Sequence, residues 1–374
     1  MKQLFFDGKG QLLVEDVPAP GAPENGALVR VAASLISSGT EMTLTAGGGS
    51  LIRRALEQPQ LIKRAFEMAL RQGVRFTAGE VQNIAETWFP AGYSAAGTVV
   101  EPGREAGGLQ PGDRVACAGA GHANHAEYDA VPLNLLARIP EEVTFRQAAF
   151  TTVGTIALQG VRRAEVTLGE TVVVVGLGLI GQITAQILDA AGCIVIGSDP
   201  VAERRELAAR LAGAHTIDPT LGDAARQVMA LTNGVGADKV ILCAATTSSQ
   251  PTNEAFEMCR ERGRVVMVGA MGMELERTTF YNRELDFVIS RSTGPGRYDP
   301  DYEERGIDYP IGYVRWTEQR NMEAFLNLVA TGKLDLDSLV SAEYPIEQAA
   351  QAYEAVEQGA LAVLLTYGEA DATA

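Results

Sequence analysis

The stretch Thr171–Asp199, TVVVVGLGLIGQITAQILDAAGCIVIGSD, decides the fold of this chain. Its first five residues, Thr171–Val175, are a β-branched run typical of a strand buried on both faces of a parallel sheet. A glycine turn, a helix, a second strand at Ile194–Ser198 and a terminal acid follow in that order. Together they form a complete dinucleotide-binding signature, which disfavours the alternative of a chance glycine-rich turn.

Each glycine of the turn has its own expected task. Gly176 permits a tight bend, Gly178 lets the backbone approach a pyrophosphate, and Gly181 lets the helix pack closely on the strand. The phosphates would lie at the helix N-terminus, where free N–H groups and the helix dipole favour an anion. In full, the cofactor-binding residues predicted for the turn and the neighbouring strand ends are Gly176, Gly178, Leu179, Ile180, Gly181, Cys243, Val268 and Gly269.

The acid at the end of the second strand favours NAD(H) over NADP(H). Asp199 can accept hydrogen bonds from both adenosine-ribose hydroxyls and would repel a 2′-phosphate. Arg204 and Arg205 weaken this preference, because a guanidinium at the start of the next helix could reach a 2′-phosphate. Arginines on a solvated helix face are the commoner alternative.

Composition and charge exclude several classes of partner. The chain has 374 residues, 46% of them hydrophobic, which is enough for two α/β domains with separate cores. Its net charge of −16 argues against binding to nucleic acid or to an anionic membrane. The first residues lack an apolar leader segment and about 18 apolar residues never run together, so we expect a cytoplasmic protein.

The rest of the chain alternates between β-rich and helical patterns. Short strands occupy residues 1 to about 45, and Leu28–Ala33 is the clearest of them. Leu51–Leu70 has the spacing of two amphipathic helices broken near Pro59, which form a packed insert or, alternatively, a substrate lid or dimer element. Strands are expected at Ala95–Val100, Val240–Ala244, Val265–Val268, Leu285–Arg291 and Ala362–Thr366, helices at Thr252–Arg260, Glu318–Thr331 and Ile346–Gln358, and a long ordered loop at Gly294–Trp316. Strands that alternate with helices predict a doubly wound parallel sheet.

This layout resembles the medium-chain dehydrogenase/reductase superfamily over essentially the whole chain. The landmarks are ISSGTE at 36–41, GYSAAGTVVEPG at 92–103, GDRV at 112–115, GLGLIG at 176–181 and PIEQAAQAYEAV at 345–356. The resemblance implies a GroES-like β-rich catalytic domain at 1–153 with a helical insert at about 49–88, a Rossmann NAD-binding domain at 154–293, and a return to the catalytic domain at 294–374. The insert and the tyrosine-rich loop are most similar to the dehydrogenase half of two-part oxidoreductases found with polysaccharide-biosynthesis genes.

The chain departs from the zinc-dependent members of this superfamily. Ser38 stands where they carry a cysteine, Gly92-Tyr93-Ser94 where they carry GHE, and no cysteine or acid lies at Thr151–Gly154. Hydroxyls in place of a thiolate and an imidazole remove the soft ligands of zinc. The four cysteines also lack a CxxC pair, so we expect free thiols and an enzyme without zinc.

Hydrogen-bond donors must then stabilise the oxyanion that forms when an alcohol loses hydride. Resemblance makes Tyr93 the first candidate, Thr40 a proton-relay hydroxyl, and Ser38 and Glu41 supporting groups. The alternatives are an aromatic wall for Tyr93 and loop hydrogen bonds for Ser38 and Glu41.

Further candidates concern the substrate and a metal. Arg297, Tyr313 and Arg315 lie in the tyrosine-rich loop, where two guanidiniums can hold a carboxylate or phosphate, although ion pairs to neighbouring acids are an equal alternative. His125 is also a candidate for substrate contact. Its spacing from His122 could suggest metal ligands, but packing or hydrogen bonding is favoured because no further ligand is nearby.

The leading functional prediction is a zinc-independent, NAD(H)-dependent dehydrogenase for a secondary alcohol or ketone of a sugar, cyclitol or similar small polar substrate. One alternative is a zinc-free enone or quinone reductase, which Asp199 disfavours because such enzymes usually prefer NADPH. Another is a nicotinamide-binding protein without turnover. The resemblance also implies a homodimer, with an edge strand at Arg277–Phe280.

Overall fold

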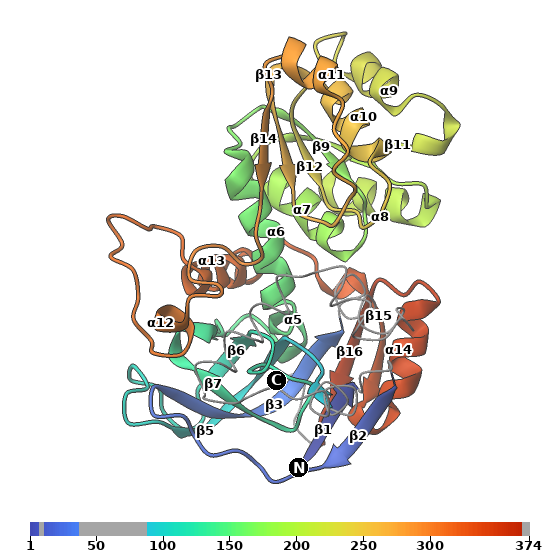
Figure 1. Ribbon diagram of the computed structural model, residues 1–374. Coiled ribbons are helices and arrows are strands. Elements are labelled where there is room, and N and C mark those ends of the chain that lie inside the picture. The colour runs from blue at the N-terminus through green and yellow to red at the C-terminus, as the bar shows by residue number, and fades with distance from the viewer. Residues whose placement is uncertain (7–10, 37–87, 369–374) are drawn as a thin grey trace, which may run out of the picture.

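The computed structural model describes residues 1–6, 11–36 and 88–368, which fold around two large sheets (Figure 1). One sheet is parallel with the strand order β11-β10-β9-β12-β13-β14. The other is mainly antiparallel with the order β15-β16-β3-β5-β6-β8, and β7 also pairs with β3. The predicted fold class, a β-rich domain joined to a Rossmann sheet, is confirmed.

Helices cover both faces of the parallel sheet, which explains its β-branched core strand. Its strands are β9 (Thr171–Val175), β10 (Ile194–Ser198), β11 (His215–Ile217), β12 (Ala237–Leu242), β13 (Cys259–Met267) and β14 (Asp286–Ile289). Helices α6 (Thr151–Ala164), α7 (Leu179–Ala190) and α8 (Ala202–Ala212) lie on one face, and α9 (Ala224–Leu231) and α10 (Gln250–Met258) on the other. Val172 and Val174 pack in one buried cluster and Val173 and Val175 in another, because successive side chains of a strand point to opposite faces.

The strand order places a switch point beside the first strand of this sheet. The chain runs outward from β9 to β11, then returns to the other side of β9 with β12. Ligands of doubly wound sheets bind at the carboxyl ends of the strands at such a point. The glycine turn after β9 lies there.

The antiparallel sheet gathers strands from both ends of the chain. Its strands are β3 (Gly26–Ile36), β5 (Ser94–Pro102), β6 (Arg114–Ala118), β7 (Tyr128–Pro132), β8 (Leu136–Arg138), β15 (Val340–Pro345) and β16 (Ala362–Thr366). A smaller sheet contains β1 (Lys2–Phe6), β2 (Leu12–Asp16) and β4 (Phe89–Pro90). The remaining helices are α5 (Phe145–Ala148), α12 (Pro300–Glu303), α13 (Glu318–Ala330) and α14 (Ala349–Glu357).

Helix α6 connects the two halves of the molecule (Figure 1). It contacts β5 and β6 of the antiparallel sheet and β12 and β13 of the parallel sheet. The boundary predicted between residues 153 and 154 lies in its first turn.

Four expected elements differ from the structure, and the first is the loop expected at Gly294–Trp316, which contains helix α12 (Pro300–Glu303). Arg277–Phe280 is not an edge strand, because α11 (Arg277–Asn282) is a helix in the crossover that parallel strands β13 and β14 require. The helix expected at Thr252–Arg260 ends at Met258, where β13 begins, and the one expected from Ile346 starts with a 3₁₀ turn before α14. The predicted insert at Leu51–Leu70 lies outside the described residues.

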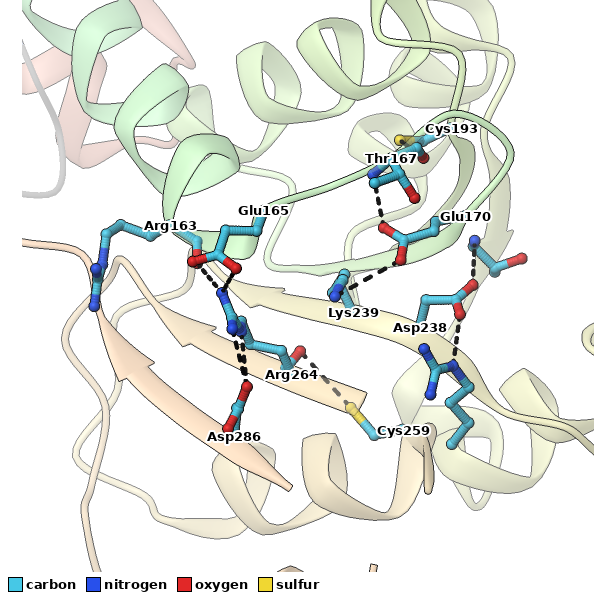
Figure 2. A network of polar contacts seen from close by, with 12 residues as sticks. Arg163, Glu165, Thr167, Glu170, Cys193, Asp238, Lys239, Cys259, Arg264 and Asp286 are labelled. Atoms are coloured by element: carbon cyan, nitrogen blue, oxygen red, sulfur yellow. Dashed lines mark hydrogen bonds and ion pairs between the residues drawn. The ribbon is translucent and has the colours of Figure 1, made fainter. Parts of the chain in front are cut away.

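The end of the parallel sheet opposite the glycine turn is joined by a network of ion pairs (Figure 2). Arg264 in β13 reaches Glu165 at 2.8 Å and Asp286 at 2.9 Å, which links the end of α6 to the start of β14. Asp238 in β12 accepts from the backbone N–H of Thr171 at 2.8 Å. These contacts align the starts of the strands whose other ends form the candidate site.

A buried carboxyl at the start of α13 is expected to make stability depend on pH. Glu318 is fully buried; its Oε1 accepts from Thr293 and its Oε2 has no hydrogen-bond partner among the described residues. Burial raises the pKa of Glu318 from 4.5 to about 7. The pKa of Glu318 is higher in the folded state than in the unfolded state. The contribution of this carboxyl to stability is therefore fully present below about pH 4.5 and is lost as the pH rises through about 7.

We expect Glu318→Gln to gain stability relative to the original chain by about 3 kcal/mol between pH 4.5 and pH 8, because Gln cannot ionise. Urea unfolding of both proteins across this range measures the difference, and groups common to both cancel. A constant difference between the two proteins would contradict the assignment.

Within the described residues, no helix combines the length and apolar character that crossing a membrane requires.

Candidate functional site

The glycine turn keeps one position open toward solvent. A Cβ on Gly176 (φ +90°) would lie 2.7 Å from the backbone of Ala244, and one on Gly181 would lie 1.9 Å from the carbonyl oxygen of Gly176. A Cβ on Gly178 would meet no atom within 4 Å. Gly176 and Gly181 are therefore required by the protein's own packing, whereas Gly178 leaves space for a ligand.

The helix that follows the turn presents its N-terminus to this space. Gly178 is the N-cap of α7 and supplies no side-chain cap, and Leu179 and Ile180 form the first turn. The N–H groups of that turn have no acceptor within the helix, and the helix dipole adds positive potential there. The turn and α7 thus form an anion-binding cradle of the kind that holds a pyrophosphate.

Asp199 lies beside the cradle at the end of β10 and is held by backbone groups. Its Oδ2 accepts from the N–H of Leu177 at 2.8 Å and its Oδ1 from the N–H of Val201 at 2.9 Å. Each carboxylate oxygen can accept a further hydrogen bond. Arg204 places a guanidinium nitrogen 4.0 Å from Oδ2, whereas Arg205 is bound to Asp218 at 3.0 Å.

Asp199→Ala is expected to destabilise the fold by about 1–3 kcal/mol, because the buried N–H of Leu177 loses its acceptor. Asp199→Asn retains one carbonyl oxygen and serves as the matched control. Urea unfolding of the three proteins measures the loss. Equal stabilities would show that the Leu177 N–H does not depend on this carboxylate.

The neighbouring strand ends complete the edge of the cradle. Cys243 donates its backbone N–H to Val175 at 2.8 Å, and Val268 and Gly269 both donate to Leu242, at 3.0 and 2.8 Å. Gly269 must be glycine, since a Cβ would lie 2.1 Å from a carbonyl oxygen of Ala244. The predicted cofactor-binding residues therefore lie at or just after the carboxyl ends of β9, β10, β12 and β13, beside the switch point of the sheet.

Tyr93 is held at the base of α6 by its backbone. Its carbonyl accepts from the Thr152 hydroxyl at 3.0 Å and from the Gly119 N–H at 3.0 Å, and its half-buried ring packs against the main apolar cluster. The next residue, Ser94, donates its hydroxyl to the Ala149 carbonyl at 2.6 Å. Three of the predicted catalytic residues, Ser38, Thr40 and Glu41, lie outside the described residues.

The described positions that correspond, by the resemblance given above, to zinc ligands are 92–94 and 151–154, and they carry no thiol, imidazole or carboxylate side chain. The hydroxyls of Ser94, Thr151 and Thr152 all donate to backbone carbonyls. A Cβ at Gly154 would lie 2.1 Å from the Phe325 ring, so a ligating side chain has no room there. Across residues 1–6, 11–36 and 88–368, no three His, Cys, Asp or Glu side chains are grouped to hold a metal ion.

His125 belongs to a buried hydrogen-bonded group. Its Nδ1 lies 2.7 Å from the Ser34 hydroxyl, which is 2.5 Å from the Tyr367 hydroxyl, and all three side chains are buried. A Cβ on Gly92 (φ +94°) would lie 2.6 Å from the His125 backbone nitrogen. His125 therefore packs directly beneath the turn that carries Tyr93.

The substrate candidates of the tyrosine-rich loop are not brought together. Arg297 pairs with Glu303, and Arg315 lies 3.8 Å from the ring centre of Trp316. Tyr313 is 92% exposed. The ion-pair alternative thus describes Arg297, while Arg315 faces a different part of the molecule.

Sequence reasoning missed two positioning groups of the site. Thr152 anchors Tyr93, and Thr184 in α7 places its hydroxyl 3.7 Å from the Cys243 sulfur. Neither threonine belongs to a recognisable motif. The sequence signal for these two residues is a threonine on the buried face of a helix, α6 for Thr152 and α7 for Thr184.

Comparison with known proteins connects this geometry to a group of dehydrogenases. A family model described as zinc-binding dehydrogenase matches residues 180–304. D-guloside 3-dehydrogenase of Escherichia coli (strain K12) is 29% identical over 258 residues, which cover 67% of this chain and 69% of that protein. D-arabitol-phosphate dehydrogenase of Enterococcus avium is 24% identical over 341 residues, which cover 82% and 89%.

The whole described architecture recurs in a solved structure. 2R,3R-butanediol dehydrogenase from Bacillus subtilis superimposes with a TM-score of 0.75 at 18% identity, over 98% of this chain and 99% of that one. At this identity the likeness shows the fold alone.

Proposed function

We propose that this chain, which belongs to the medium-chain dehydrogenase/reductase family and is an NAD(P)-dependent dehydrogenase, uses NAD(H) without zinc. Its substrate, in this proposal, is a secondary alcohol or ketone of a sugar, cyclitol or similar small polar molecule. The observation that carries the proposal is the open position at Gly178 beside Asp199. The absence of zinc is proposed because the hydroxyls of Ser94, Thr151 and Thr152 donate to backbone carbonyls.

Different residues of the cradle are proposed to bind different parts of the cofactor. The first-turn N–H groups of α7 would hold the pyrophosphate, and Asp199 would accept from the adenosine ribose. When bound, the nicotinamide supplies the hydride acceptor or donor. Arg204 bears on the choice of cofactor, because its guanidinium faces the Asp199 carboxylate.

Side-chain hydroxyls would carry the proton chemistry in this proposal. The Tyr93 hydroxyl would donate to the substrate oxygen as negative charge develops there, and Thr40 would move the proton onward. The hydrogen bond from Thr152 fixes the Tyr93 backbone, which limits the positions that the phenol can take. Ser38 and Glu41 are proposed to be supporting groups of the same catalytic site.

The names of the relatives support the substrate class. The two most informative ones act, by name, on a guloside and on an arabitol phosphate, both polyhydroxylated. A screen of sugar alcohols, glycosides and their phosphates with NAD and NADP, followed at 340 nm, tests the proposal. NAD-dependent turnover of a polyol supports it, whereas reduction of enones with NADPH favours the reductase alternative.

Removal of metal is expected to leave turnover unchanged. After dialysis against a chelator, the enzyme should contain substoichiometric zinc and keep its kcat. Stoichiometric zinc that resists dialysis, or activity restored only by added zinc, would contradict the assignment. We also propose a homodimer, for which light scattering on the purified protein is the measurement.

A further inference from the structure

A second pocket lies away from the cofactor cradle, between three helices on one face of the parallel sheet. Its volume is about 440 Å³, within the range of small-molecule sites. The wall is largely apolar and comes from α6 and the two residues after it, from α7, from α13 and from Trp316, which lies two residues before α13. Its lining residues include Leu158, Val161, Arg162, Glu165, Ile187 and Trp316.

Two arginines are stacked on the indole of Trp316, and one of them, Arg162, lines the pocket together with Trp316. The Arg162 guanidinium lies 3.4 Å from the ring centre of Trp316, and that of Arg315 lies 3.8 Å from it. The Nε of Arg162 donates to Asn321 at 2.7 Å. The ring contact and the hydrogen bond together orient the Arg162 guanidinium, so this side chain has less entropy to lose when a ligand binds.

The positive charge of this pair has no counter-charge in the described part of the chain. Neither Arg162 nor Arg315 forms an ion pair there, and the acid among the lining residues, Glu165, is bound to Arg264 at 2.8 Å (Figure 2). Burial, with a further contribution from Arg315, lowers the pKa of Arg162 to about 10. Two cations close together without an acid cost free energy that an anion would recover.

The pocket is distinct from the proposed cofactor and catalytic groups. Arg162 lies ten residues beyond Thr152 on α6, about 15 Å along the helix. The α7 residues that line the pocket, Ile187, Ala190 and Ala191, are at the end of α7 opposite Gly178. A ligand here would not compete with the pyrophosphate.

We propose that this pocket binds an amphipathic carboxylate, whose apolar body lies against Leu158, Val161 and Ile187 and whose anion is held by Arg162 and Arg315. A guanidinium matches the planar geometry of a carboxylate and can bind it in a bidentate manner, and the second guanidinium adds positive charge beside the same indole. The apolar wall explains why a hydrocarbon or aromatic body is required beyond the charge. This inference does not depend on the identity of the dehydrogenase substrate.

Trp316 provides a direct readout of binding. The chain has two tryptophans, so Trp88→Phe leaves Trp316 as the single tryptophan. Octanoate is titrated into this protein, with 1-octanol as the neutral probe of equal chain length. We expect a saturable change in fluorescence with octanoate and affinity at least about tenfold weaker for octanol, since a charged hydrogen bond is lost.

Variants of the two arginines separate charge from packing. Arg162→Gln and Arg315→Gln should each weaken octanoate binding about tenfold or more, while Arg163→Gln, which changes the exposed neighbour, should not. Arg315 is exposed, so its variant remains informative even if Arg162→Gln fails to fold. NADH affinity should be unchanged in Arg315→Gln.

The outcomes that overturn the proposal are equally specific. Absence of saturation with octanoate, equal affinity for octanol, or an equal loss in Arg163→Gln would each do so. Octanoate that displaces NADH would show binding at the cofactor cradle instead. Failure of the polyol screen would leave these results unaffected, because fluorescence reports on Trp316 without turnover.

Discussion

Gly178→Val is expected to abolish measurable NADH binding while the protein remains folded. A Cβ at this position would meet no atom within 4 Å outside its chain neighbours, and the backbone angles of Gly178 (φ −66°, ψ −171°) are open to any residue. The valine would instead occupy the space in front of the α7 N-terminus, where the pyrophosphate is proposed to bind. We expect NADH affinity to fall at least about 100-fold, equivalent to about 3 kcal/mol.

The matched control is Gly181→Val, which changes the same motif for a different physical reason. Its Cβ would lie 1.9 Å from the Gly176 carbonyl oxygen, so this variant should unfold or lose much of its stability. NADH titration by fluorescence and thermal unfolding of both variants separate the two roles. If Gly178→Val binds NADH normally, the open position is not the phosphate site.

Tyr93→Phe is expected to lower kcat by about 10²–10⁴-fold with little change in NADH affinity. The substitution removes only the phenolic oxygen, and the contacts of the Tyr93 carbonyl with Thr152 and Gly119 remain. In our proposal this oxygen donates to the substrate as charge develops, so its loss acts on turnover rather than on cofactor binding.

A control variant distinguishes this role of the Tyr93 hydroxyl from a general effect on the fold. Tyr281→Phe on α11, at the far end of the parallel sheet in Figure 1, removes a hydroxyl elsewhere and should leave kcat unchanged. Full turnover by Tyr93→Phe would restrict Tyr93 to an aromatic wall. Equal losses in both variants would indicate a general effect on the fold.

The parts of the fold predicted from sequence are those set by local patterns. The strands Thr171–Val175, Ile194–Ser198 and Ala362–Thr366 have the predicted bounds because runs of buried apolar residues end at glycine or polar residues. The glycine turn was predictable from its local motif, and two of its glycines, Gly176 and Gly181, meet a local steric demand.

The parts that were missed depend on contacts between distant segments. Helix α6 is buried along most of its length because strands of both sheets pack against it, and these contacts join segments that are far apart in the sequence. Arg315 was grouped with Arg297 by sequence proximity, yet the fold places Arg315 and Arg162 on one indole. Residues 277–280 were expected as a strand from resemblance, whereas the parallel pairing of β13 and β14 requires a crossover that contains α11.

The central claim is that this dehydrogenase stabilises the developing oxyanion with side-chain hydroxyls and NAD(H) alone. The most direct test is single-turnover hydride transfer, with NAD and the polyol found by the screen, in enzyme whose zinc content has been measured after chelation. We predict an unchanged rate in metal-depleted enzyme and a reduced rate in Tyr93→Phe. A rate that vanishes on metal removal and returns with zinc, independent of Tyr93, would contradict the account.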